Sequence, residues 1–317
     1  MKIYVITGQT ATGKTAKALE TAKKANGELI NFDSRQVYKK LDIVTGKDID
    51  TTTFHSVEKR GNFVIGYYAI QEPTTDHRPP IKIWLYDVAD PKTVFSSYDF
   101  IKCAQLAIKR IVKEGKTPVL VGGTYLYLYH LLYDIPEGNE PNWRLRKELE
   151  ELDISKLQRR LEKKSPDIFS KLNNSDLHNP HRLIRKIELA ESGQKTYANL
   201  PRDEITLGTK LGIDNMEIEI IGLVYEKSED LRKAVTERVD KRLAAGAVNE
   251  LKKLLTMGYK LTDPGLITIG YPQIKQFIDG ETTEEQLKAE WITKELKYAK
   301  RQYTFMKRDK NIKWVLV

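Results

Sequence analysis

The sequence predicts an α/β protein: a parallel sheet of the P-loop NTPase type, flanked by helices, with a helical lobe inserted in the chain. Three observations lead to this fold class. Short apolar runs alternate with helical stretches, which is typical of a parallel sheet covered on both faces. A glycine-rich loop joins the first expected strand to the first expected helix. The middle of the chain shows helical spacing of Leu and Ile and no convincing strand.

The first strands are expected at residues 2–8, 28–34 and 117–123. The helix expected at residues 14–25 closes at the stop signal of Asn26 and Gly27, and Gly115 ends the helix before the third strand. In a parallel sheet, ligands collect at the carboxyl ends of the strands. Residues 8–15, 33–38 and 122–124 stand at these ends and are polar or glycine-rich. We therefore predict one cleft there.

Further along the chain, an edge hairpin is expected within residues 51–88, where the runs 62–70 and 81–88 flank a turn-rich segment. Residues 216–225 predict another strand, which a long helix at about 228–257 and a last helix at about 283–307 follow. A stretch rich in proline and glycine at 134–142 marks a boundary. We predict a P-loop catalytic core of residues 1–133 and 206–317, with C-terminal helices, and a helical insertion of residues 134–205.

Composition limits the possible partners and compartments. Lys and Arg number 53 against 44 Asp and Glu, so the formal net charge is +9, which favours polyanionic partners. The single cysteine, Cys103, excludes disulfides and multi-cysteine metal sites, and its place in a predicted helix indicates a core thiol in a reducing compartment. No apolar run suits a signal peptide or a membrane span. We expect a cytoplasmic protein that does not bind membranes and acts as a monomer.

The loop "GQTATGKT" fits the phosphate-binding pattern GxxxxGK[ST]. Its glycines allow backbone N–H groups to converge on phosphate oxygens. Lys14 would bridge the terminal phosphates and the Thr15 hydroxyl would bind Mg²⁺, the one cofactor that we expect. We predict that a diphosphate is bound by Gly8, Thr10, Ala11, Thr12, Gly13, Lys14 and Thr15. Such a loop also binds the diphosphate of metabolites other than nucleotides, so it does not identify the reaction.

A set of short segments follows in order along the chain: "GQTATGKT", "DSRQVYKKLDIVTGKD", "LVGGTYLYL", "ERVDKRLAAG", "TIGY" and "YAKRQYTF". As a set they resemble the tRNA dimethylallyltransferases, over about residues 3–308. The resemblance implies that dimethylallyl diphosphate sits on the phosphate loop. It also implies that the exocyclic amine of a flipped-out adenosine, 3′ to the anticodon, attacks the first carbon of the dimethylallyl group and releases diphosphate.

The resemblance also implies roles for individual residues. Asp33 matches the aspartate that accepts a proton from the amine. Thr15 with Mg²⁺, Lys14 and Arg238 would stabilise the leaving diphosphate, so the expected catalytic set is Asp33, Thr15 and Arg238. Two alternatives stay open. In the first, Asp33 caps the next helix or binds Mg²⁺ and is not the proton acceptor. In the second, Arg238 belongs to an exposed ion-pair face and does not bind the diphosphate.

The expected partners are dimethylallyl diphosphate and the anticodon stem-loop of tRNA. Basic residues gather in the predicted insertion and in the last helix, which favours an RNA surface on both sides of the cleft. The resemblance implies target-base and tRNA contacts for Ser34, Gln36, Val37, Gly123, Thr124, Arg182, Arg185, Lys300 and Arg301. In the last helix Trp291, Tyr298 and Phe305 recur every seven residues, a spacing that we interpret as core packing.

The chain departs from the family pattern at three places. Residues 83–87 read "IWLYD" in place of a histidine-rich segment, so Trp84 stands where histidine contacts are expected. Tyr125 replaces a small residue and is expected to reshape the channel for the target base. Ala234 stands in place of an arginine, and Lys233 or Arg232 is the expected substitute.

Other functions stay open from the sequence. Prenylation of a free adenine nucleotide, as in cytokinin synthesis, is also compatible with "LDIVTGKD". A small-molecule kinase would use the same phosphate loop with ATP. The last alternative is an RNA-binding protein without enzymatic activity, which the basic segments alone would allow.

Overall fold

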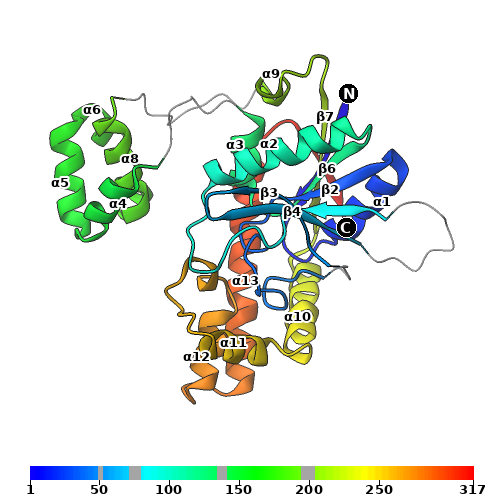
Figure 1. The fold of residues 1–317 in the computed structure, drawn as a ribbon. Helices are drawn as coiled ribbons and strands as arrows, with labels where there is room; N and C mark the ends of the chain where they lie inside the picture. Colours follow the sequence, from blue (N-terminus) through cyan, green and yellow to red (C-terminus); the bar gives the residue numbers. More distant parts are fainter. Residues whose placement is uncertain (49–52, 71–79, 134–140, 194–203) are drawn as a thin grey trace. The chain divides into compact units, whose positions relative to one another are not determined.

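The computed structural model describes residues 1–48, 53–70, 80–133, 141–193 and 204–317. The chain divides into two compact units, which are described separately. The core unit comprises Met1–Tyr133 with Arg202–Val317, and the helical unit comprises Asp134–Pro201. The colours in Figure 1 follow the sequence. Strands from both parts of the core unit, blue to green and yellow to red, lie in one sheet.

The core unit is built on one sheet with the strand order β3-β4-β5-β2-β6-β1-β7-β8. All pairs are parallel except β3 with β4 and β4 with β5. The predicted fold class is therefore confirmed. The strands are β1 Lys2–Gly8, β2 Gly27–Asn31, β3 His55–Arg60, β4 Phe63–Ala69, β5 Lys82–Trp84, β6 Thr117–Val121, β7 Glu217–Val224 and β8 Ile312–Leu316.

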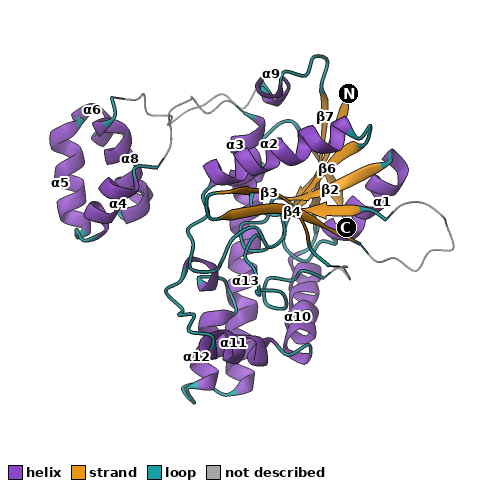
Figure 2. Ribbon diagram, viewed as in Figure 1, coloured by secondary structure: helices purple, strands orange, loops and turns teal. Residues whose placement is uncertain are grey.

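Helices flank this sheet (Figure 2). In the core unit they are α1 Lys14–Ala25, α2 Ser97–Lys113, α3 Tyr125–Leu132, α9 Leu207–Leu211, α10 Ser228–Ala244, α11 Ala247–Thr256, α12 Tyr271–Ile278 and α13 Glu284–Met306, with a 3₁₀ turn at Pro264–Leu266. Ser96 and Asp99 form a capping box that starts α2. Cys103 is buried on α2, which confirms the predicted core thiol.

The register brings the predicted ligand-binding ends together. In the central strands, Asn31 of β2 pairs with Val121 of β6, and Ile6 of β1 pairs with the same residue. The segments that follow these three strands therefore leave the same edge of the sheet. Apolar side chains from several strands, among them Ile6, Leu29 and Val119, are fully buried around α1. The core thus fixes where the three segments begin.

Three parts of the core unit differ from the expectations. The predicted hairpin is present as antiparallel β4 and β5. It is extended by β3, which was not predicted because the exposed charged residues of β3 show no alternating pattern. The helix expected at 228–257 is two helices, because the chain turns at Gly246, where φ is 98°. The strand β8 was missed. It is a strand of only five residues after the last helix, and of these only Ile312 is buried.

The helical unit contains α4 Trp143–Glu150, α5 Ile154–Lys164, α6 Pro166–Phe169, α7 Asn174–Leu177 and α8 Pro180–Glu191. Its described residues form helices and no strand, as predicted. A leucine core closes it, with Leu149, Leu157, Leu161 and Leu183 fully buried. In neither unit does the described part of the chain hold a helix long and apolar enough to cross a membrane.

Candidate functional site

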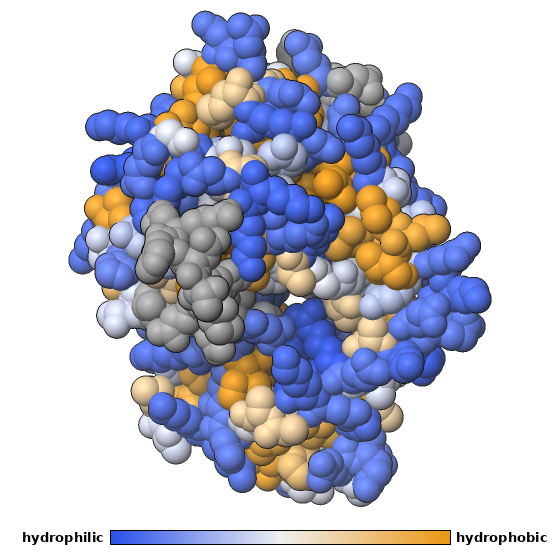
Figure 3. Space-filling view, turned by 90° about the vertical axis from the view of Figure 1, so that its right-hand side faces the viewer, coloured by the Kyte–Doolittle hydropathy of each residue, from blue (hydrophilic) through white to orange (hydrophobic). Residues whose placement is uncertain are grey.

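Two cavities lie at the carboxyl ends of the parallel strands. The first has a volume of about 410 Å³, and the phosphate loop forms one wall, so we call it the loop cavity. The second has a volume of about 350 Å³ and four arginines among its lining residues, so we call it the arginine cavity. The two cavities share Thr10, Asp33, Arg238 and Tyr298. On the face in Figure 3 the molecule is hollowed, and mostly hydrophilic residues border the hollow.

The phosphate loop has the backbone that its glycines predict. Gly8 has φ 134°, and a Cβ there would lie 2.2 Å from the carbonyl oxygen of Leu223 on the neighbouring strand. Gly13 caps α1 with φ 73° and has open space around it, so its conformation and not crowding requires glycine. Thr10, Ala11, Thr12, Gly13, Lys14 and Thr15 all line the loop cavity.

Lys14 reaches from the start of α1 into the loop cavity. Its Nζ donates to the backbone carbonyl of Gln9. Burial, and then the positive charge of Arg238, lower the pKa of Lys14 from 10.5 to about 7. Asp33 acts in the opposite direction. Since an anion in the cavity would favour the protonated form, Lys14 is prepared to take up a proton when a diphosphate binds.

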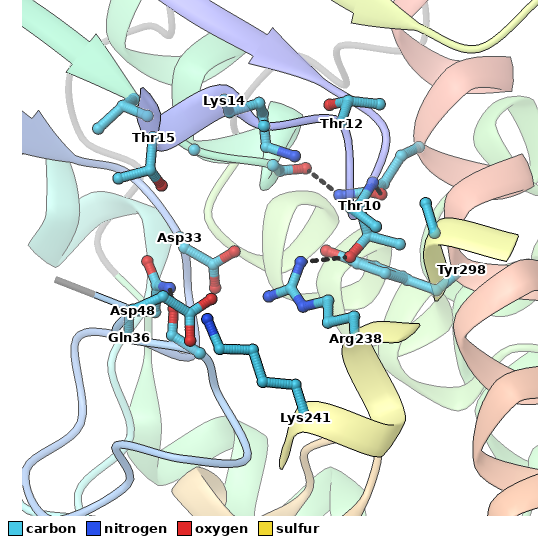
Figure 4. Close-up of a pocket in the computed structure, with 18 of the residues that line it drawn as sticks. Thr10, Thr12, Lys14, Thr15, Asp33, Gln36, Asp48, Arg238, Lys241 and Tyr298 are labelled. Carbon is cyan, nitrogen blue, oxygen red and sulfur yellow. Dashed lines mark hydrogen bonds between the residues drawn. The ribbon is translucent and has the colours of Figure 1, made fainter. Parts of the chain in front are cut away.

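Asp33 follows β2 and lines both cavities. Its backbone N–H donates to Oδ1 of Asn31 at 3.0 Å, and its own Oδ1 accepts the N–H of Arg35 at 2.8 Å. The next residues form a turn and not a helix, so Asp33 holds a turn and caps no helix. Its Oδ2 lies 3.9 Å from the position of a Cβ built on Gly123. Figure 4 shows the carboxylate between Thr15 and Arg238.

Ser34 and Thr124 close one side of the arginine cavity. Thr124 Oγ1 accepts the N–H of Ser34 at 3.0 Å and lies 3.2 Å from its hydroxyl oxygen. Tyr298 is half-buried, lines both cavities and hydrogen-bonds Thr124, and burial raises its pKa above the usual value. The core prediction for the seven-residue series is therefore correct for Trp291, which is fully buried, and wrong for Tyr298.

Gln36 lines the loop cavity, and its Nε2 donates to the carbonyl oxygens of Thr45 and Gly46 at 3.3 and 2.7 Å. Val37 needs a correction. It was predicted to contact the target base, but it is fully buried and lines neither cavity. The turn directs Val37 into the core, while Gln36 lines the loop cavity.

Arg238 lies at the junction of the two cavities, where its Nη1 donates to Oγ1 of Thr10 at 3.0 Å. This position argues against the alternative of an exposed ion-pair face. One turn further along α10, Arg242 is buried and pairs with Glu295 at 3.1 Å. Burial, and then the charge of Arg238, lower the pKa of Arg242 to about 10. Within the described residues the buried Nε atoms of both arginines have no hydrogen-bond partner.

The departures from the family pattern have structural explanations. Trp84 is buried and its indole N–H donates to Glu28 at 2.7 Å. Tyr125 is buried, donates its hydroxyl to Asp309 and packs on Phe305 at 5.2 Å between ring centres. It lines neither cavity, so the expected reshaping of the channel by Tyr125 is wrong.

Ala234 lines the loop cavity, but Lys233 and Arg232 are exposed and line neither cavity. The expected substitution of the missing arginine by one of them is therefore wrong. Lys241, which is two turns beyond Ala234 on α10, lines the loop cavity instead. Side chains seven residues apart lie on the same face of a helix.

The residues predicted to contact tRNA differ in their surroundings. Arg301 is exposed, lines the arginine cavity and holds its guanidinium 5.9 Å from the ring centre of Tyr298. Lys300 is exposed and lines neither cavity. In the helical unit, Arg182 pairs with Asp176 at 2.8 Å and Arg185 pairs with Glu188.

Sequence reasoning missed several residues of this site, and Gln302 is the clearest. Its Oε1 accepts the N–H of Thr10 at 2.9 Å, and its Nε2 donates to the carbonyl of Gly123 at 2.9 Å. It thus ties the phosphate loop to the end of β6 from within α13. Others line the loop cavity: Asp48, Tyr225, Glu237 and Lys241. For α10, the helical spacing from Ala234 was a signal that would have found Glu237 and Lys241.

Comparisons with known proteins agree over the whole chain. Residues 69–309 match the family described as "IPP transferase", and residues 1–59 match "Isopentenyl transferase". A curated tRNA dimethylallyltransferase from Endomicrobium trichonymphae is 32% identical over 98% of this chain and 94% of its own length. One from Acetivibrio thermocellus is 30% identical over 99% of this chain and 91% of its own length.

Solved structures are similar as well. The full-length tRNA isopentenylpyrophosphate transferase of Bacillus halodurans matches with a TM-score of 0.63 and 28% identity, over 99% of this chain and 89% of that protein. A eukaryotic dimethylallyltransferase acting on tRNA matches with a TM-score of 0.72 and 23% identity, over 99% and 73%. At 23% identity, the similarity to the eukaryotic enzyme shows a shared fold and nothing more.

Proposed function

This chain belongs to the tRNA dimethylallyltransferase family, and we propose that it transfers the dimethylallyl group from dimethylallyl diphosphate to the exocyclic amine of the adenosine 3′ to the anticodon. One observation carries the proposal: two cavities meet at a single carboxylate, that of Asp33. A group transfer needs a donor site and an acceptor site with a common wall. The loop cavity is the donor site and the arginine cavity is the acceptor site.

The donor diphosphate lies against the phosphate loop. Backbone N–H groups of the loop, Lys14 and Arg238 supply the positive potential that the diphosphate needs as it leaves. Arg238 is held in place by its hydrogen bond to Thr10, so little reorganisation is needed when charge develops on the leaving oxygen. The dimethylallyl group then points from the loop toward Asp33.

The residues present fit a magnesium ion. Hard oxygen ligands suit Mg²⁺, and the Thr15 hydroxyl and the carboxylate of Asp48 line the loop cavity. The described residues contain no cluster of three His, Cys, Asp or Glu side chains that would hold a metal by themselves. This agrees with an ion bound mainly through substrate phosphates. When bound, Mg²⁺ would neutralise negative charge on the diphosphate.

Asp33 acts on the acceptor. The amine nitrogen of adenosine forms a bond to the first carbon of the dimethylallyl group, and the bond from that carbon to oxygen breaks, with its electrons going to diphosphate. The nitrogen becomes positively charged as it attacks, and Oδ2 of Asp33 accepts its proton. Because Oδ1 is already bonded to the N–H of Arg35, the carboxylate is held in one orientation.

The arginine cavity suits a flipped-out nucleotide. Ser34 and Thr124 offer hydroxyl groups to the edges of a base, and the ring of Tyr298 offers an aromatic surface. Arg301 is placed to meet a phosphate at the opening. Lys300 and the helical unit, with Arg182 and Arg185, extend the proposed RNA contacts to the anticodon stem-loop. The enzyme is proposed to act as a monomer.

Competition between substrates tests this function. Labelled dimethylallyl diphosphate and Mg²⁺ are given with unmodified tRNA, with AMP, or with both, and label in each acceptor is counted. We expect label in tRNA and little in AMP. Label mainly in AMP would instead support an adenylate prenyltransferase. Release of the γ-phosphate from ATP, with no label in either acceptor, would support a kinase.

A further inference from the structure

We infer that Lys241 binds the diphosphate of the prenyl donor, as a second cation on the α10 side of the loop cavity. This inference rests on the proposed function and adds a donor-binding residue to it. It is carried by the position of Lys241 on α10, by the charges around it and by the lack of a partner for its ammonium group among the described residues.

The face of α10 that borders the loop cavity is defined by spacing. Ala234, Glu237, Arg238 and Lys241 occupy positions i, i+3, i+4 and i+7, which lie on one side of a helix, and all four line the cavity. Ala234 is uncharged, Glu237 is acidic, and Arg238 and Lys241 are basic. Figure 4 shows Arg238 and Lys241 extending from α10 toward Asp33 and Asp48, with Lys14 on the opposite side.

Among the described cations that line the loop cavity, Lys241 is the one whose side chain has no partner. The carboxylates are Asp33, Asp48 and Glu237, and the cations are Lys14, Arg238 and Lys241. Lys14 donates to the carbonyl of Gln9 and Arg238 donates to Thr10. Among the described residues, Lys241 has no hydrogen bond or ion pair through its side chain.

A diphosphate needs such a group. It carries several negative charges, and three carboxylates already line the cavity. Lys14 already donates to the backbone carbonyl of Gln9 and Arg238 to the hydroxyl of Thr10. Lys241 is exposed on α10, and it lines the cavity from the side opposite Lys14. It attracts the diphosphate and then pairs with it.

The experiment compares Lys241→Ala with Lys233→Ala. Both lysines are exposed on α10, so both variants should fold, but only Lys241 lines the cavity. Loss of one charged hydrogen bond costs about tenfold or more in affinity. We expect Lys241→Ala to weaken inorganic diphosphate binding and to raise KM for dimethylallyl diphosphate by about tenfold, with KM for tRNA unchanged. Lys233→Ala should match the wild type, and Lys241→Arg should stay within a fewfold of it.

Charge relocation provides a second test. In the Lys241→Ala background, Ala234→Arg restores a cation on the same helix face and should recover most of the diphosphate affinity. Equal affinity of Lys241→Ala and Lys233→Ala, or a double variant no better than Lys241→Ala alone, would overturn the inference. Diphosphate binding is measured without tRNA. A wild type that binds diphosphate but transfers no prenyl group would refute the proposed function and leave this comparison intact.

Discussion

At the scale of single residues, Asp33 shows how one carboxylate is given two tasks. Oδ1 holds the turn through Arg35, and Oδ2 remains for the substrate. Asp33→Asn keeps an oxygen acceptor for the turn but removes the base. Turnover should fall by about a hundredfold or more, the scale of a lost general base, while tRNA affinity is retained.

Single-turnover rates and filter binding of tRNA measure the two effects of Asp33→Asn separately. Asp33→Ala, which also removes the turn acceptor, is the companion variant and should lose thermal stability as well. Equal turnover of wild type and Asp33→Asn would mean that another group removes the proton.

Lys14 makes diphosphate binding depend on pH. Its pKa in the free protein is about 7, and a bound anion raises it. Above pH 7 the protein must therefore take up a proton when the diphosphate binds, and affinity should fall as pH rises. Calorimetry at pH 8, in buffers of different ionisation enthalpy, should detect this uptake. Lys14→Arg, whose charge does not titrate there, is the control. Equal proton uptake by the wild type and Lys14→Arg would show that Lys14 is not the group that takes up the proton.

Arg242 and Glu295 form a buried pair whose separation should be costly. Arg242→Ala leaves a buried, uncompensated carboxylate, and such changes destabilise by about 3–5 kcal/mol. Replacing both residues together, with Arg242→Met and Glu295→Leu, removes both charges and should cost much less. Urea unfolding of Arg242→Met, Glu295→Leu and the double variant measures the difference. Additive losses in the double variant would show that the pair is not coupled.

At the scale of elements, α13 connects the phosphate loop to the end of β6 through Gln302. Adding a Cβ at Gly123 would place it 2.4 Å from Nε2 of this side chain. Gly123→Ala should therefore break the bridge between Thr10 and β6 and lower kcat/KM by about tenfold to a hundredfold, because a small misplacement of reacting groups is costly.

A double-variant cycle identifies the cause of that loss. Gln302→Ala removes the bridge without a clash, so Gly123→Ala should add little in that background. Steady-state kinetics of both singles and the double decide. Full additivity would mean that Gly123→Ala acts on the substrate directly.

Elements differ in how well the sequence predicted them. The strand, loop and helix of residues 2–25 carry local signals, namely apolar residues, glycines and an Asn-Gly stop, and they were predicted with correct bounds. β3 and β8 depend on neighbours far along the chain, and their exposed residues carry no alternation. Tyr298 was assigned to the core because spacing shows which side chains share a face but not what that face meets.

At the scale of the whole molecule, the account depends on segments far apart in the chain. Thr10, Asp33, Arg238 and Tyr298 come from both parts of the core unit and meet between two cavities. The phosphate loop and the family resemblance predicted the first three. The meeting itself follows from the pairing of β1 with β7, which brings the second part of the core unit to the first.

The net charge of +9 gives a prediction for the complete protein. If phosphate contacts hold the tRNA, affinity should fall linearly on a logarithmic plot as salt increases. Inorganic diphosphate binding, which involves fewer phosphates, should show a shallower slope. Filter binding of tRNA and calorimetry of diphosphate over the same salt range measure both. Equal slopes would argue against an extended RNA surface.

The most direct test is the mass of the nucleosides released from tRNA after incubation with wild-type protein, dimethylallyl diphosphate and Mg²⁺. We expect one adenosine, 3′ to the anticodon, to gain a five-carbon prenyl group, and no such product with Asp33→Asn. An unchanged nucleoside profile with folded, diphosphate-binding wild-type protein would contradict the account.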